Sequence, residues 1–199
     1  MIAIITGDII DSQQRDTKTW LKALKKALNK YGKEPTSWEI YRGDSFQLEL
    51  DAKNALEKVI AIKAILKKED IEVRMSIGIG KKDHTAKKIT ESNGSAFVNS
   101  GDCFETLKKN TLALKSPWKN FDEIINIMLD LALLTIDNWS ATSAELVKIG
   151  LENPEKKQTE LTKLLNKTQS TISEGFKRAG YDEILKMIDF YNKKIEEKC

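Results

Sequence analysis

Two aspartates in short polar turns are the residues of this sequence best suited to metal chemistry. Asp8 follows an apolar run, and Asp44 lies in a Gly-Asp turn between two alternating segments. If both turns meet at one end of a sheet, their carboxylates form an oxygen-rich site for Mg²⁺ or Mn²⁺. A pair of such ions would activate a hydroxyl and neutralise a leaving pyrophosphate. The turn after Asp8, with Asp11 and Ser12, offers backbone N–H groups to phosphates.

A second candidate site lies at residues 157–180, whose pattern resembles a helix-turn-helix. Asn166 suits the left-handed turn between two helices, because Asn tolerates that conformation. Thr168 is a good cap for the second helix. Ile172 and Phe176 are spaced to face inward on that helix.

The exposed side of this second helix carries the polar residues expected to contact DNA. Base edges are read near the start of a recognition helix, where the candidates are Thr168, Gln169, Ser170, Thr171 and Ser173. Lys177 and Arg178 suit DNA phosphates. Residues 156–178 carry a local net charge of +4, which favours a nucleic acid partner.

The elements that must position both sites follow from hydrophobic periodicity. Predicted strands cover residues 2–6, 38–41, 45–50, 72–80 and 111–114. Predicted helices cover residues 17–31, 52–68 and 95–109. The order β-α-β-β-α-β, then α-β, indicates an α+β, ferredoxin-like domain with its helices on one face of the sheet. A doubly wound parallel sheet is disfavoured, because it needs a helix between every pair of strands.

The chain changes character at Pro117, after which no strand pattern appears. Helices are predicted there at residues 121–139, 140–150, 158–166, 168–179 and 181–198. We therefore expect two domains: a ferredoxin-like domain at residues 1–117 and an all-α helix-turn-helix domain at 118–199.

Composition excludes several classes of protein. The chain has 199 residues, of which 32% are charged and 40% hydrophobic, so disordered and fibrous classes are excluded. No apolar run is long enough to span a membrane, and no signal peptide pattern is present, so a cytoplasmic location is expected. Two cysteines and one histidine offer neither a disulfide framework nor a zinc site, and they disfavour a histidine-based triad.

Several motifs resemble class III nucleotide cyclases and the palm-like GGDEF domain of diguanylate cyclases. Gly7-Asp8-Ile9-Ile10 is similar to the cyclase metal motif, and Arg42-Gly43-Asp44-Ser45-Phe46 resembles the Gly-Asp hairpin of both families. The resemblance implies metal binding by Asp8, Asp44 and the Ile9 carbonyl. It also implies nucleotide contacts by Asp11, Ser12, Arg42, Gly43 and Asn99.

The sequence departs from these families in three ways, one of which is that Arg42 and Ser45 occupy the places of the first Gly and of the Glu in the GGDEF signature. Cyclases have an arginine four residues after the asparagine that matches Asn99, and here that position is Cys103. Trp38 stands where a purine-reading lysine would be expected. The resemblance therefore implies fold and nucleotide or metal binding more directly than turnover.

Across its whole length, the chain resembles the bacterial SatD family. That resemblance implies a cyclase-like domain joined to a DNA-binding tail like that of sigma-factor-type regulators.

Three functions stay open at this point. The first is a homodimeric transcription regulator that binds DNA and senses a nucleotide or a divalent metal. The second is a metal-dependent nucleotidyl-transfer or cyclase-type enzyme that uses Asp8 and Asp44. The third is a structural adaptor in which Asp8 only caps a segment, Asp44 only forms a turn, and Arg42 pairs with one of them.

Overall fold

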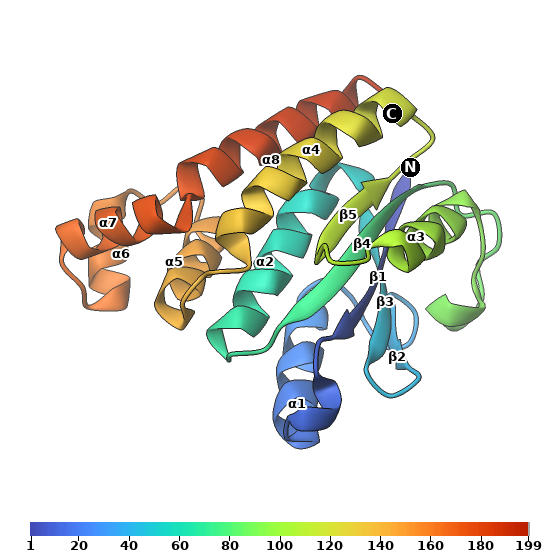
Figure 1. The fold of residues 1–199 in the computed structure, drawn as a ribbon, viewed down its shortest axis with the longest axis horizontal. Coiled ribbons are helices and arrows are strands. Elements are labelled where there is room, and N and C mark those ends of the chain that lie inside the picture. The colour runs from blue at the N-terminus through green and yellow to red at the C-terminus, as the bar shows by residue number, and fades with distance from the viewer. Residues whose placement is uncertain (199) are drawn as a thin grey trace.

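The computed structural model of the protein describes residues 1–198, and its centre is a mixed five-stranded sheet (Figure 1). The strands are β1 (Ile2–Ile9), β2 (Trp38–Tyr41), β3 (Ser45–Asp51), β4 (Val73–Gly80) and β5 (Leu112–Lys115). Their order across the sheet is β2-β3-β1-β4-β5. All neighbours are antiparallel except β4 and β5, which are parallel. The mixed α and β content predicted from the sequence is confirmed.

Eight α-helices surround this sheet within residues 1–198. They are α1 (Thr17–Leu28), α2 (Ala55–Lys68), α3 (Ser95–Thr106), α4 (Lys119–Ile136), α5 (Ala141–Glu152), α6 (Gln158–Leu165), α7 (Gln169–Ala179) and α8 (Tyr181–Glu196). Short 3₁₀ turns lie at Ser12–Gln14, Ala52–Asn54 and Ile89–Glu91. Each predicted helix is present, with ends displaced by a few residues, as is usual where helix ends fray.

The helices occupy both faces of the sheet. Ala3 and Ile5 of β1 point into the main core with α1 and α2, whereas Ile4 packs with Ala96 of α3 on the opposite face. Figure 1 shows α2 and α3 on opposite sides of the sheet. The expectation of helices on one face therefore holds for α1 and α2 and is wrong for α3.

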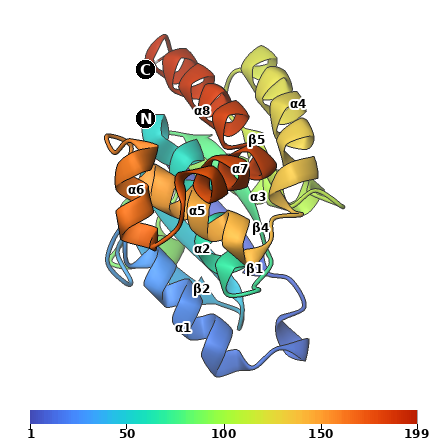
Figure 2. The same cartoon turned by 90° about the vertical axis from the view of Figure 1, so that its left-hand side faces the viewer.

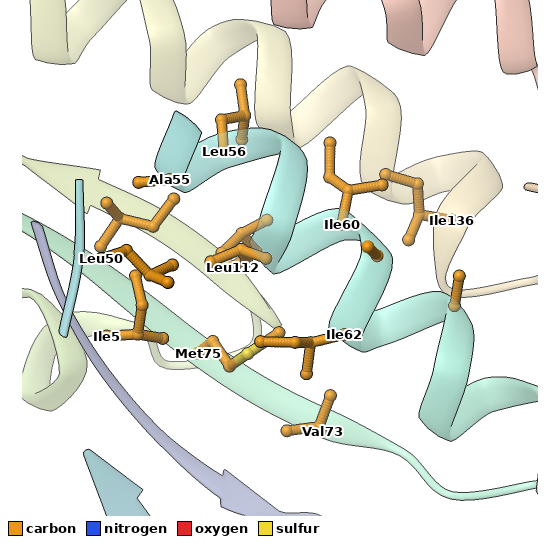
Figure 3. Packing of buried hydrophobic residues seen from close by; sticks show 14 of the residues in the cluster. Ile5, Leu50, Ala55, Leu56, Ile60, Ile62, Val73, Met75, Leu112 and Ile136 are labelled. Atoms are coloured by element: carbon orange, nitrogen blue, oxygen red, sulfur yellow. The ribbon is translucent and has the colours of Figure 1, made fainter. Parts of the chain in front are cut away.

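Helices α4, α5 and α8 share the hydrophobic core of the sheet. Figure 3 shows Ile136 of α4 pointing toward Ile60 of α2, in the cluster that also holds Ile5 and Met75. The buried Tyr191 hydroxyl of α8 donates a hydrogen bond of 2.6 Å to the Ala52 carbonyl. The strands end at Lys115 as expected, but one continuous core joins the two parts of the chain.

A buried lysine adds a polar link between these parts. The Lys63 side chain of α2 is 4% exposed and lies 3.0 Å from the Asp137 carboxylate at the end of α4. It also donates hydrogen bonds to the Val73 carbonyl and the Thr111 hydroxyl. Burial lowers the pKa of Lys63, and the Asp137 carboxylate opposes that effect.

Candidate functional site

Strand pairing brings the two predicted aspartates to the same end of the sheet. Asp8 lies opposite Ser45 of β3, and Asp44 is the residue just before Ser45. On its other side Asp8 lies opposite Arg74 of β4. Buried and less buried positions alternate along β3, so a slip of one residue against β1 would turn the buried side chains of β3 to its other face.

A cleft of about 510 Å³ opens at this end of the sheet. Its lining includes five of the predicted site residues, namely Asp8, Ile9, Asp11, Ser12 and Asp44. The remaining lining residues are Ile10, Gln13, Gln14, Arg74, Lys108, Lys109, Asn110 and Thr111. The structure therefore groups most of the predicted metal and phosphate ligands in one place.

Both carboxylates already have hydrogen-bond partners. The Arg74 guanidinium donates two hydrogen bonds of 2.7 Å, one to each Asp8 oxygen, and the Ser12 hydroxyl donates to Asp44. The hydrogen bonds to Asp8 raise the pKa of Arg74 above its usual range. The adaptor alternative pairs Arg42 with one of the aspartates, but among the ion pairs of residues 1–198 the partner of Asp8 is Arg74, and Arg42 pairs with neither aspartate.

The lining of this cleft carries equal numbers of acidic and basic groups. Asp8, Asp11 and Asp44 are its acids, and its bases are Arg74, Lys108 and Lys109. Within residues 1–198, no group of three or more His, Cys, Asp or Glu side chains converges as metal ligands do. Mg²⁺ commonly takes one or two carboxylates and completes its shell with water and substrate phosphates. The donor set thus fits a metal bound together with phosphates better than a metal bound alone.

Three predicted nucleotide contacts lie outside the lining of this cleft. Arg42 and Gly43 form the exposed hairpin turn, both with positive φ (50° and 89°). Asn99 of α3 donates a hydrogen bond of 2.8 Å to the Ile79 carbonyl. Ile79 pairs with Ala3, five residues along β1 from Asp8, which is about 17 Å at the rise of a strand.

Sequence reasoning did not assign roles to the cations of the cleft. Arg74 lies in a strand whose alternation is evident, so its place beside Asp8 depends on which strand is the neighbour of β1. Lys108 and Lys109 follow α3, and Lys108 has the left-handed φ of 51° that ends the helix abruptly. The available signal was a pair of lysines at the very end of the helix predicted at residues 95–109.

The two helices of the predicted helix-turn-helix are present as α6 and α7. Asn166 adopts the left-handed conformation at the end of α6, and the Thr168 hydroxyl accepts a hydrogen bond of 3.2 Å from the Thr171 N–H. Ile172 and Phe176 are buried with Leu161 in a small separate core. All the predicted DNA contacts are exposed, namely Thr168, Gln169, Ser170, Thr171, Ser173, Lys177 and Arg178.

A glycine inside α7 has a packing role. Gly175 is buried, and a Cβ added there would overlap the Leu146 side chain of α5. Glycine is unfavourable inside a helix by about 1 kcal/mol relative to alanine. The close approach of α5 and α7 explains why glycine is present at this position. Through this contact α7 packs against α5 and keeps its polar face exposed.

Within the described residues, no helix has both the length and the apolar character needed to cross a bilayer. Searches of protein-family models, curated proteins and solved structures find no match to this chain.

Proposed function

We propose that the protein is a DNA-binding regulator whose α6 and α7 contact DNA and whose cleft at Asp8 and Asp44 binds a nucleotide with Mg²⁺ or Mn²⁺. The observation that carries the proposal is α7 itself. One face of this helix is buried, and its exposed face has hydroxyl and amide groups near the N-terminus with Lys177 and Arg178 in the last turn. Polar groups near the start of a helix can contact base edges, and cations near its end can contact phosphates.

A gel-shift experiment on genomic fragments tests the DNA-binding part. At about 50 mM salt, release of counterions strongly favours binding, so we expect a subset of fragments to be retained by the full-length protein. Retention of no fragment at this salt would contradict the proposal and favour the adaptor function instead.

The strand order supports the nucleotide-binding part. The order β2-β3-β1-β4 with α1 and α2 on one face is what a ferredoxin-like βαββαβ unit requires. It agrees with the resemblance to cyclase and GGDEF palm-like domains and to the SatD family. We propose that Asp8, Asp44 and the Ile9 carbonyl hold the metal, and that the cations of the same cleft neutralise the phosphates.

Replacement of Asp44 by Asn is expected to abolish stabilisation by a metal-nucleotide pair. A ligand at 100 times its Kd adds about 2.7 kcal/mol to the free energy of unfolding. The measurement is a thermal-shift panel of nucleoside triphosphates and cyclic dinucleotides, with and without Mn²⁺. Asp83→Asn is the matched control, because Asp83 is an exposed loop residue away from the cleft. An unchanged shift in Asp44→Asn would place the ligand elsewhere.

A second candidate function is nucleotidyl transfer at the same cleft. It is favoured by the three carboxylates and three cations that line the same cleft. Incubation of the protein with each stabilising triphosphate and Mn²⁺, followed by chromatography of the products, separates the two functions. A regulator leaves the nucleotide intact, whereas an enzyme releases pyrophosphate.

The proposed regulator acts as a homodimer, and α4 supports this with an exposed apolar stripe. The stripe consists of Ile124, Ile127, Leu131 and Leu134, whose exposed fractions are 47%, 56%, 65% and 72%. Their 3-4-3 spacing is that of a coiled-coil seam. A second copy would present the same uncharged stripe, as an interface with twofold symmetry requires.

The double variant Leu131→Glu, Leu134→Glu is expected to be monomeric at concentrations where the wild type is dimeric. Four glutamates would face each other across the dimer axis in a desolvated interface, where unpaired charges are costly. Sedimentation velocity measures the mass. Leu164→Glu on α6 is the control, since Leu164 is 56% exposed but lies outside the stripe. A wild type that is monomeric at every concentration would contradict this part of the proposal.

A further inference from the structure

A second cleft of about 510 Å³ lies between α1, α2 and α5, away from the Asp8 and Asp44 site. Its lining is dominated by lysines, namely Lys18, Lys22, Lys26, Lys30, Lys68 and Lys148. Glu69 is its one acidic lining residue, and Ala23 and Ile65 are the apolar ones. The cleft is therefore strongly positive, although the whole chain carries a net charge of only +3.

The lysines of α1 are the ones free to bind a ligand. Lys30 and Lys148 both pair with Glu152, and Lys68 pairs with Glu145 at 2.8 Å. Within residues 1–198, the structure gives no ion pair to the three remaining lysines, Lys18, Lys22 and Lys26, and all three are exposed. An exposed cluster of like charges without counter-ions from the protein attracts anions from solution.

These three lysines form a row that runs along α1 and turns by about 40° at each step. They lie four residues apart on one face of α1, whose opposite face is buried through Trp20, Leu24 and Leu28. At 1.5 Å per residue, the row spans about 12 Å in steps of about 6 Å. A row of regularly spaced cations suits a linear series of anions better than a single compact anion.

The chemistry of the lining also indicates a sequence-independent ligand. The cleft has no aromatic side chain for stacking on a base and no Asn or Gln for reading a base edge. It also lacks the paired carboxylates that would hold a divalent metal. What remains is charge at regular spacing, which is the way proteins contact the phosphates of a nucleic acid backbone.

The row lies on the same side of the molecule as the helix-turn-helix. Figure 2 shows α1, α5 and α6 together on the side that faces the viewer. The wall of the cleft includes Lys148 of α5, and α5 packs directly against α7 through Leu146 and Gly175. We propose that Lys18, Lys22 and Lys26 bind the phosphate backbone of the same DNA duplex that α7 contacts. They contact a part of the duplex that α7 itself does not reach. This inference rests on the proposed DNA binding.

The test compares two triple variants that remove the same charge from different places. Lys18→Gln, Lys22→Gln, Lys26→Gln removes the row, whereas Lys87→Gln, Lys119→Gln, Lys193→Gln removes three exposed lysines of the loop before α3, α4 and α8. Fluorescence anisotropy measures affinity for a retained genomic duplex between about 50 and 200 mM salt. We expect the row variant alone to bind about tenfold more weakly or worse and to have a salt slope smaller by about 2 to 3.

A truncated duplex separates this inference from the proposed function. On a duplex cut to the segment protected by α7, the row variant and the wild type should bind alike, because the phosphates for the row are absent. If the wild type binds DNA and both triple variants show its salt slope on the long duplex, the inference is overturned while the proposed function stands. If the wild type binds no duplex, both are overturned.

Discussion

Gln169→Ala is expected to weaken binding to a specific DNA site by a factor of about 5 to 150 and to leave binding to random DNA nearly unchanged. Gln169 is the first residue of α7 and is exposed. A glutamine in this position can form two hydrogen bonds to one adenine, and such a contact contributes about 1–3 kcal/mol of discrimination. The measurement is a titration of wild type and variant against a retained genomic fragment and against a random duplex of equal length.

Lys177→Ala is expected to weaken DNA binding in a different way, because the expected partner of Lys177 is a phosphate and not a base. Lys177 is exposed in the last turn of α7 and makes no ion pair within the described residues. Its loss should lower affinity for every sequence alike and reduce the salt slope by about one. Lys193→Ala on α8 is the matched control and should bind as the wild type does.

A result in which both variants lose the same fraction of affinity on all sequences would contradict base reading by α7. It would leave α7 as an electrostatic contact only. The mild net charge of the helical segment implies few phosphate contacts from each copy, so a dimer with half-sites about one helical turn apart, or a multiple of it, is expected.

Gly78→Ala is expected to lower the free energy of unfolding by about 3 kcal/mol, the largest stability effect that we predict for a single methyl group. A Cβ at Gly78 of β4 would overlap backbone atoms of Ser100 and Ala96 in α3. Overpacking of this kind costs about 1–3 kcal/mol and sometimes more, and backbone atoms of a packed helix cannot rotate away. For a domain of this size, the melting temperature should fall by about 6–12 °C.

Gly101→Ala is the matched control, since it also adds one methyl group to a glycine near this contact. Gly101 is also in α3, but a Cβ there would meet no atom within 4 Å. Alanine is more favourable than glycine inside a helix by about 1 kcal/mol, so this variant should be slightly more stable than the wild type. Thermal melting of both variants measures these changes in stability. A Gly78→Ala protein as stable as the wild type would show that α3 does not pack this closely against β4.

The close contact of α3 with Gly78 also explains a set of buried hydrogen bonds that the sequence pattern does not predict. Where α3 crosses β4, the buried Ser100 hydroxyl donates to the Thr6 hydroxyl at 2.7 Å, and the Ser76 hydroxyl donates to the Ser100 carbonyl at 2.8 Å. In the sequence, Ser76 resembles a solvent-facing position, because apolar and small or polar residues alternate along β4. These hydroxyls are buried because glycines in β4 let a helix cover that face.

The helices α6 and α7 and the turn between them could be predicted from sequence because their signals are local. Asn166 at the turn, Thr168 at the cap and Ile172 on the buried side all act within one or two turns of helix. The meeting of Asp8 and Asp44 was also predictable, since a hairpin next to the first strand leaves few possible registers. The partner of Asp8 was not predictable. Strand β1 has two neighbours, and Arg74 meets Asp8 only because β4 is the neighbour of β1 on the side opposite β3.

The sequence by itself determined where the helices, the strands and the turns lie, because hydrophobic periodicity, caps and turns act over short distances along the chain. Only the tertiary structure decided which exposed residues become neighbours. In the folded chain Arg74 binds Asp8, and Asn99 lies away from the cleft that Asp8 lines. The lysines of α1 line a second cleft together with Lys148 of α5. Those pairings join residues far apart in sequence, and they follow from the packing of one shared core that no local pattern encodes.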